Sequence, residues 1–322
     1  MVAAFDRRRL LIGAVVAAVT AGCAKEAPPA ARAGEVAVGV LLVAHGSRSR
    51  NWAGALEDFA AAVGQALAGR PGLQGVKLAY LGSDKASIAG AMREFDGAGV
   101  GEVIVVPLML ADESTLTNEY LSYLVGMRSE ARALQGLRND GYEIYKPRAR
   151  ATITPALATS EALKKNVLRR VEALRGEDDG EKLGVLLVGY GDRKYGQQME
   201  ELVQGLGRYL KVQTPIDTVG FAFCGELVEY SGEAVAKALN EVLELEEQVI
   251  VVPVLLAVDE KLQRDAIQAA IEAIDTPARV RYRPDALLPD PAIGKWVVEK
   301  VDEALERVRD AGGAMVPAQN RG

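Results

Sequence analysis

Short apolar runs alternate with amphipathic stretches along most of the chain. The runs have the length of strands buried on both faces, and the stretches between them repeat apolar positions at helical spacing. Predicted strands lie near 37–44, 75–81, 102–108, 142–150, 183–189, 216–223, 248–255 and 279–284, and predicted helices near 51–68, 86–98, 115–137, 158–175, 194–211, 229–246, 260–274 and 291–310. This alternation predicts an α/β protein with parallel sheets covered by helices.

The same pattern occurs twice. Residues 39–48 read Gly-Val-Leu-Leu-Val-Ala-His-Gly-Ser-Arg, and residues 184–193 read Gly-Val-Leu-Leu-Val-Gly-Tyr-Gly-Asp-Arg. Residues 103–111 match residues 249–257 in the same way, through a shared Val-Ile-Val-Val-Pro. A nearly constant offset between the copies indicates a duplication. We therefore expect two tandem domains, each with a parallel sheet of about four strands, related by a pseudo-twofold axis across a cleft, the usual place for a ligand.

Composition sets the domain boundaries. The polar, glycine-bounded segment 175–182 separates a first domain at 36–175 from a second at 182–310, and 311–322 forms a tail. A chain of 322 residues suits two domains of ordinary size. The net charge of −6 argues against a nucleic-acid partner, because phosphate binding needs a basic face.

Residues 1–22 have the features of an export signal. Three arginines from Arg7 onward precede an apolar run too short to span a bilayer, a pattern typical of the twin-arginine route. Thr20–Cys23 resembles a lipobox, in which Cys23 is lipidated, and 23–35 forms a flexible tether. The prediction is a periplasmic or cell-surface lipoprotein held to the membrane by its lipid. The alternatives are an uncleaved anchor and a misassigned start of a cytoplasmic protein.

His45, the only histidine of the chain, ends the first predicted strand. Ligands of open α/β sheets bind beyond the carboxyl ends of the strands. A neutral imidazole accepts a proton and binds borderline metals such as Co²⁺ and Fe²⁺. Gly46 and Ser47 would form a turn with anion-binding amides, and Arg48 could pair with a substrate carboxylate or be solvated. The alternative for His45 is a turn residue bonded to the backbone.

The His-Gly-Ser turn, the Val-Val-Pro of the third strand and the duplication together resemble the sirohydrochlorin cobaltochelatase (CbiX-like) family and, more distantly, the ferrochelatases. The likeness covers nearly all of the chain after residue 36. It implies two flavodoxin-like domains of the chelatase fold and a lyase that inserts Co²⁺ or Fe²⁺ into sirohydrochlorin or a related tetrapyrrole. It also implies that His45 is the metal ligand and proton acceptor, that the metal is a substrate, and that no organic cofactor is needed.

The chain departs from the family pattern after the third strand of the first half. The family places a second histidine there, in a Gly-x-His pattern, whereas this chain has Thr115. Distant chelatases pair a histidine with a glutamate, which makes Glu113 the preferred partner of His45 in catalysis and metal binding, ahead of Asp112 and Glu119. Thr115 is assigned to substrate binding. Acidic residues at this place could also simply cap the following helix.

The second half departs further. Tyr190 replaces the histidine, Lys261 stands where Thr115 stands in the first half, and Asp265 where Glu119 stands. The second half is therefore not expected to bind metal. Tyr190 is assigned to substrate binding, together with Gly46, Ser47 and Arg48 of the first half.

Two functions remain open on the sequence. One is the chelatase, and the other is a non-catalytic tetrapyrrole- or metal-binding lipoprotein that kept the fold and the cleft. Export favours the second, because tetrapyrrole biosynthesis is normally cytoplasmic. One chain would supply both halves of the cleft, so a monomer is expected.

Overall fold

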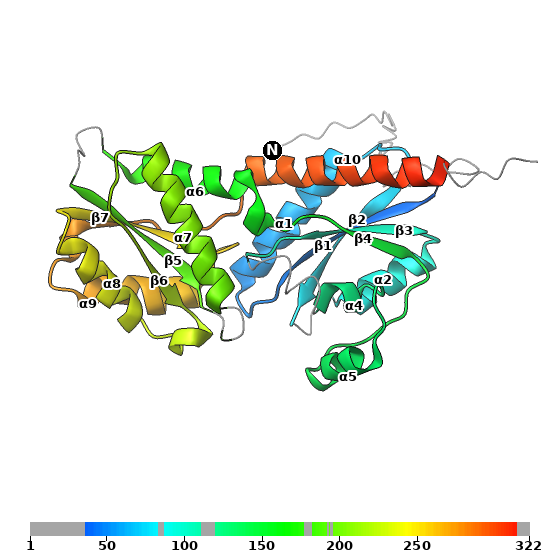
Figure 1. Cartoon of the computed structure of the whole chain (residues 1–322), viewed down its shortest axis with the longest axis horizontal. Helices are drawn as coiled ribbons and strands as arrows, with labels where there is room; N and C mark the ends of the chain where they lie inside the picture. The colour runs from blue at the N-terminus through cyan, green and yellow to red at the C-terminus, as the bar shows by residue number, and fades with distance from the viewer. Residues whose placement is uncertain are drawn as a thin grey trace, which may run out of the picture.

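The computed structural model describes residues 36–82, 87–110, 120–176, 182–191, 193 and 196–313, with side chains as far as residue 310. It contains two four-stranded parallel sheets, ordered β2-β1-β3-β4 and β6-β5-β7-β8 (Figure 1). The strands are β1 (Val38–His45), β2 (Leu73–Leu81), β3 (Glu102–Pro107), β4 (Arg150–Ile153), β5 (Leu183–Tyr190), β6 (Val219–Cys224), β7 (Gln248–Val254) and β8 (Val280–Tyr282). The identical strand order confirms the predicted duplicated α/β fold.

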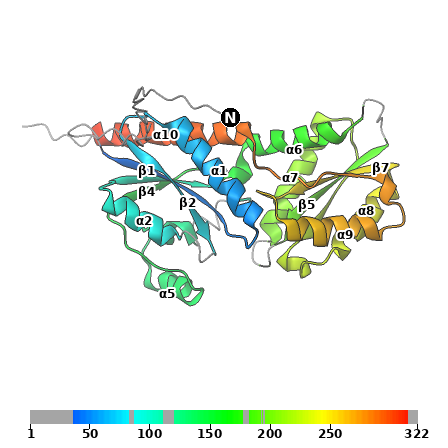
Figure 2. The same ribbon diagram turned by 180° about the vertical axis from the view of Figure 1, so that it is seen from behind.

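Helices cover both faces of each sheet (Figures 1 and 2). They are α1 (Arg50–Leu67), α2 (Ile88–Gly97), α4 (Ser122–Leu124), α5 (Ala131–Asn139), α6 (Glu161–Leu174), α7 (Gly196–Gln213), α8 (Glu233–Leu243), α9 (Ala269–Ala273) and α10 (Pro291–Gly313), with a π-helical turn at Leu262–Gln268 before α9. Helix α1 shows why they form. Its N-cap Ser49 accepts a hydrogen bond from the backbone N–H of Trp52, and Leu56, Phe59 and Val63 recur at helical spacing on its buried side.

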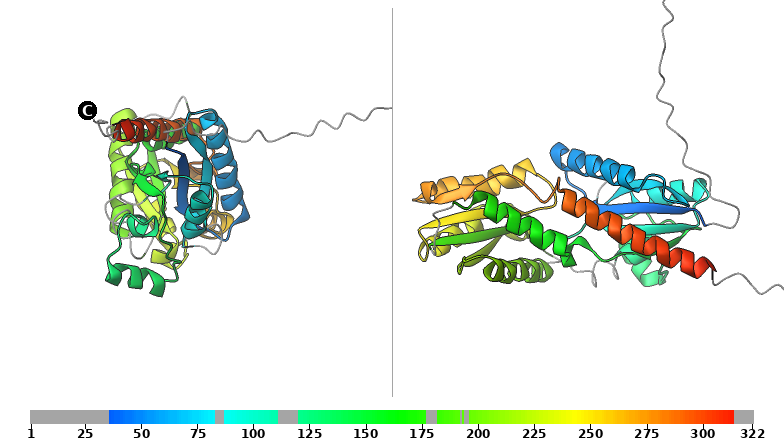
Figure 3. Two further views of the ribbon diagram at one scale, coloured as in Figure 1. Left: turned by 90° about the vertical axis from the view of Figure 1, so that its right-hand side faces the viewer. Right: turned by 90° about the horizontal axis from the view of Figure 1, so that it is seen from above.

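The last helix of each half packs on the sheet of the other half. Helix α6 lies against β7, and α10 lies against β3 and α1, an exchange that is plain in Figure 3. An ion pair of 3.1 Å between Arg70, which follows α1, and Asp302 of α10 joins the exchanged helix to its host domain. The domain bounds 36–175 and 182–310 stay a prediction from the order of the chain, whereas in the packing each final helix lies against the sheet of the other half.

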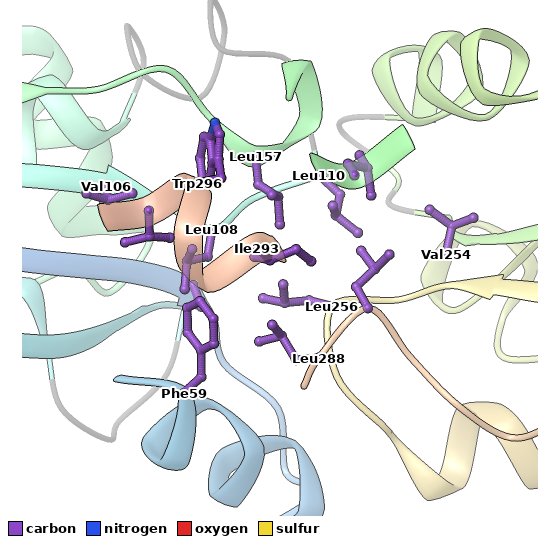
Figure 4. Close-up of a cluster of buried hydrophobic side chains, with 14 of the residues drawn as sticks. Phe59, Val106, Leu108, Leu110, Leu157, Val254, Leu256, Leu288, Ile293 and Trp296 are labelled. Atoms are coloured by element: carbon purple, nitrogen blue, oxygen red, sulfur yellow. The ribbon is translucent and has the colours of Figure 1, made fainter. Parts of the chain in front are cut away.

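One hydrophobic core runs through both halves. Leu108 and Leu110 follow β3, Val254 ends β7, Leu256 follows it, and Ile293 begins α10, and Figure 4 shows these side chains packed together where the halves meet. All are buried. Each fully buried aliphatic side chain contributes about 1.5–3 kcal/mol. The two halves are thus joined by apolar burial rather than by a loose linker.

Two predicted elements differ from the structure between β3 and β4. The helix predicted at 115–137 breaks at Gly126, whose φ of +78° and close approach to Pro147 suit glycine. The strand predicted at 142–150 begins only at Arg150. Asp96 at the end of α2 accepts hydrogen bonds from the backbone N–H groups of Arg148 and Ala149, which fixes the two residues directly before β4.

The predicted signal, Cys23 and the tether lie outside the described residues, as does the tail from residue 314. No helix in the part of the chain that the structure describes is both long and apolar enough to cross a bilayer.

Candidate active site

His45 is the last residue of β1 and is half-buried at the carboxyl edge of the first sheet. Its backbone oxygen accepts a hydrogen bond of 3.0 Å from the indole Nε1 of Trp52. The next residue, Gly46, donates its N–H to the carbonyl of Leu81 at the end of β2, at 3.1 Å. Both bonds fix the peptide group that follows the histidine, so β1 presents His45 at the edge where ligands of such sheets bind.

The turn after His45 contacts the second domain directly. The hydroxyl of Ser47 donates to Oδ2 of Asp259 at 2.6 Å, and that of Ser49 donates to Oε2 of Glu260 at 2.5 Å. The bond from Ser49 lowers the pKa of the Glu260 carboxyl, because it stabilises the ionised form. The carboxyl ends of β1 and β7 therefore meet at this turn. Arg48 is exposed beside it.

Asp259 connects the two domains and was not among the predicted site residues. Its carboxylate is buried, and Oδ1 accepts hydrogen bonds from the N–H groups of Lys261 and Leu262, which caps the following helix. The repeat contained a signal for it: the offset of 146 residues between Val103 and Val249 places Asp259 opposite Glu113. In the second copy, this position caps a helix and binds the His45 turn.

The acidic half of the predicted metal site lies outside the described residues. This applies to Asp112, Glu113, Thr115 and Glu119. Among the residues that the structure describes, no three side chains of His, Cys, Asp or Glu gather as a metal site. The pairing of His45 with Glu113 therefore stays a prediction.

Tyr190 holds the position of His45 in the second sheet. The N–H of the following residue, Gly191, donates to the carbonyl of Cys224 at 2.6 Å, which repeats the bond from Gly46 to Leu81. The Tyr190 ring packs on Gly225, where a Cβ would lie 2.5 Å from a ring carbon. The tyrosine thus supports the connection after β6, and its assignment to substrate binding stays a prediction.

The other counterparts in the second half, Lys261 and Asp265, make contacts with residues outside the repeat motif. Lys261 places its Nζ 4.8 Å from the ring centroid of Tyr230. Asp265 is exposed and forms an ion pair of 2.7 Å with Arg264, and the hydrogen bond from Arg264 lowers the pKa of its carboxyl.

An open pocket lies beyond the carboxyl ends of β5 and β6. Its volume is about 450 Å³, and it is lined by Arg193, Glu226, Glu229 and Tyr230. Sequence reasoning missed these residues. Arg193 is the counterpart of Arg48 in the repeat, but the residues after β6 belong to no motif.

Two parallel-sheet domains whose strand ends meet beside a histidine are similar in fold to the solved two-domain chelatases. Solved structures agree. SirB from Bacillus subtilis with Fe³⁺ has a TM-score of 0.61 at 18% identity, covering 85% of this chain and 97% of that chain. SirB from Bacillus subtilis subspecies spizizenii in complex with cobalt has a TM-score of 0.58 at 18% identity, and the match covers 84% of this chain and 95% of that chain. CbiX, the terminal enzyme of siroheme biosynthesis in denitrifying bacteria, has a TM-score of 0.52 at 17% identity, and the match covers 83% of this chain and 98% of that chain. At these identities the likeness shows the fold.

Residues 39–174, which carry His45, match the family model CbiX. The match covers the first half of the chain, and the fold of both halves is similar to that of the solved SirB and CbiX structures. A comparison with curated proteins found no match.

Proposed function

We propose that this protein inserts a divalent metal, Co²⁺ or Fe²⁺, into sirohydrochlorin or a related tetrapyrrole, as a lyase. The observation that carries the proposal is the placement of His45: it ends β1 at the carboxyl edge of the CbiX-like domain, on a backbone fixed by Trp52 and Leu81. The structures of SirB with iron and with cobalt support these metals as substrates.

His45 has the chemistry that insertion requires. A metal that enters the macrocycle replaces the pyrrole N–H protons, so a base must accept them at the strand edge. A neutral imidazole accepts a proton near neutral pH and also binds borderline divalent metals. His45 would hold the incoming metal and take up a released proton, with Glu113 as the carboxylate that assists.

The second domain positions this turn. The bonds from Ser47 to Asp259 and from Ser49 to Glu260 attach the segment after His45 to the opposite half. Because α6 and α10 exchange between the halves over one core, the two strand edges keep a fixed spacing. A preorganised site loses less free energy on binding a rigid macrocycle.

The test is the initial rate of Co²⁺ or Fe²⁺ insertion into sirohydrochlorin, followed by absorbance under anaerobic conditions. The proposal predicts a rate that is proportional to protein concentration and exceeds the uncatalysed rate. Binding of the macrocycle at the uncatalysed rate would instead identify the protein as a tetrapyrrole carrier, and the enzyme proposal would be wrong.

We also propose export as a lipoprotein, on the arginine-rich start and the lipobox-like segment ending at Cys23. Incorporation of a labelled fatty acid by cells that express the chain tests it. The label should disappear in Cys23→Ser, and equal labelling of both chains would contradict the proposal.

A further inference from the structure

The pocket of the second domain is not used by the chemistry assigned to His45. Its volume of about 450 Å³ is within the range of ligand pockets, about 300–1,000 Å³. Arg193 follows β5, and the other lining residues, Glu226, Glu229 and Tyr230, follow β6. The pocket therefore lies at the carboxyl edge of the second sheet, the edge that meets the His45 turn.

The connection that forms the pocket has a fixed and unusual backbone. Glu229 and Tyr230 both have positive φ, 52° and 61°, a region that costs energy for residues other than glycine. Two hydrogen bonds hold this backbone shape. The N–H of Leu227 donates to the carbonyl oxygen of Gly191, and the N–H of Tyr230 donates to the carbonyl oxygen of Gly225. In this backbone the Tyr230 side chain, which lines the pocket, stays 39% exposed.

Short contacts connect the pocket to the candidate active site. Lys261 places its Nζ 4.8 Å from the Tyr230 ring centroid, and its backbone N–H donates to Oδ1 of Asp259 at 3.1 Å. The other oxygen of Asp259 accepts the hydroxyl of Ser47, two residues after His45. The pocket and the His45 turn are thus linked through Asp259 and Lys261.

The charges of the pocket leave a cation available. Arg193 Nε donates to the backbone carbonyl of Glu226 at 3.3 Å, and its Nη2 lies 3.5 Å from Oε1 of Glu229, with the Arg193 and Glu229 side chains 67% and 84% exposed. An exposed pair at this distance contributes little, so another carboxylate can take the place of Glu229. A guanidinium binds such a group through two parallel hydrogen bonds.

We propose that this pocket binds one edge of the tetrapyrrole substrate, with Tyr230 against the face of the macrocycle and Arg193 on a peripheral carboxylate. The inference rests on the proposed function, because it takes its ligand from there. The exposed ring of Tyr230 suits a flat apolar face, and the weakly paired Arg193 suits the acidic substituents around it. The second domain then holds the macrocycle, while the first domain handles the metal.

The experiment is a fluorescence titration of the full chain with metal-free sirohydrochlorin, at low and at high salt. Tyr230→Asn removes the ring but suits a left-handed backbone, and should weaken binding about tenfold, whereas Tyr230→Phe should bind like the wild type. Arg193→Gln should weaken binding about fivefold at low salt and less at high salt. Glu229→Gln should tighten binding about twofold, because it removes the competing carboxylate.

Lys295 and Glu299 provide the matched control. They form a similarly long and exposed pair, at 3.6 Å, on α10. Lys295→Gln and Glu299→Gln should leave the affinity within twofold of the wild type, which is the order of effect left by an exposed pair that takes no part in binding.

The outcomes separate the two proposals. Weakened binding in Tyr230→Asn and Arg193→Gln supports the pocket even when the wild type inserts no metal, and in that case only the enzyme proposal is wrong. Unchanged affinity in both variants, with macrocycle bound by the wild type, overturns the pocket and leaves the chelatase intact. A wild type that binds no macrocycle overturns both.

Discussion

Ser47 and Asp259 show how single side chains join the halves of the molecule. The Ser47 hydroxyl and the Asp259 carboxylate are 212 residues apart in the chain and 2.6 Å apart in the structure. The carboxylate also caps a helix through its other oxygen. Both oxygens of a buried carboxylate are therefore satisfied, as burial requires.

Removing the Ser47 hydroxyl should destabilise the protein. In Ser47→Ala, Oδ2 of Asp259 loses its donor, and we expect a decrease of about 1–2 kcal/mol in the free energy of unfolding. Urea denaturation measures the change. Ser129→Ala, at an exposed serine before α5, is the control and should be neutral. Equal stability of Ser47→Ala and the wild type would show that this bond does not help to hold the domains.

Cys224 predicts a pH-dependent reactivity. Burial raises the pKa of its thiol to about 12, because the apolar surroundings disfavour the thiolate. In a Cys23→Ser chain, a thiol reagent at pH 9 should therefore label Cys224 only after denaturation. The native state keeps the proton that the unfolded state loses above about pH 8.5, so this group lowers stability as the pH rises from there toward 12. Rapid labelling of native protein would contradict the burial.

At the scale of elements, Asp96 positions the segment that leads into β4. Burial alone raises the pKa of this carboxyl, but the N–H groups of Arg148 and Ala149 and the hydroxyl of Tyr145 donate to it, and the net pKa is lowered. The ionised form is thus stabilised in the native state. The end of α2 thereby sets the start of the edge strand.

Replacement of Asp96 should expose this role. Asp96→Asn keeps the shape of the side chain but puts an amide donor against other donors. We expect the free energy of unfolding to decrease by about 1–3 kcal/mol. Because the native pKa is lowered, the contribution of Asp96 is present above about pH 4 and is lost as the pH falls below it. The stability difference between wild type and variant should therefore shrink in acid. Asp140→Asn, at an exposed site, should show neither effect, and a pH-independent difference for Asp96→Asn would contradict the account.

Local patterns predicted the strands and the duplication well, because each buried strand is a short apolar run with its own turn signals. The break at Gly126 and the late start of β4 depend on Pro147 and Asp96, which are distant along the chain from what they contact. Likewise, the His45 turn was visible as a motif, whereas its contacts with Asp259 and Glu260 arise only when the second half folds against it.

At the scale of the whole molecule, the exchange of α6 and α10 makes the two halves interdependent. The apolar side of α10 would suit either sheet, so its sequence does not reveal which one it covers. The side chains of Ile293, Trp296 and Val297 pack in the core that both halves share. Neither half has a complete core without a helix from the other.

This interdependence predicts a single unfolding transition. Scanning calorimetry should give a calorimetric enthalpy close to the van't Hoff enthalpy for the whole chain. Leu108→Ala, in the shared core, should shift the entire transition to lower temperature and decrease the free energy of unfolding by about 2–5 kcal/mol. The control Val212→Ala, at an exposed position, should have no effect. Two separate transitions would show that the halves unfold independently and would contradict the shared core.

We propose that metal insertion takes place at His45. The most direct measurement is the initial rate of Co²⁺ insertion into sirohydrochlorin by wild type and His45→Ala, at equal amounts of bound macrocycle and with folding checked by circular dichroism. The insertion rate of His45→Ala should be about 100-fold or more below that of the wild type, close to the uncatalysed rate, because the variant lacks the imidazole proposed to accept the proton and bind the metal. A His45→Ala protein that inserts the metal as fast as the wild type would contradict the proposal.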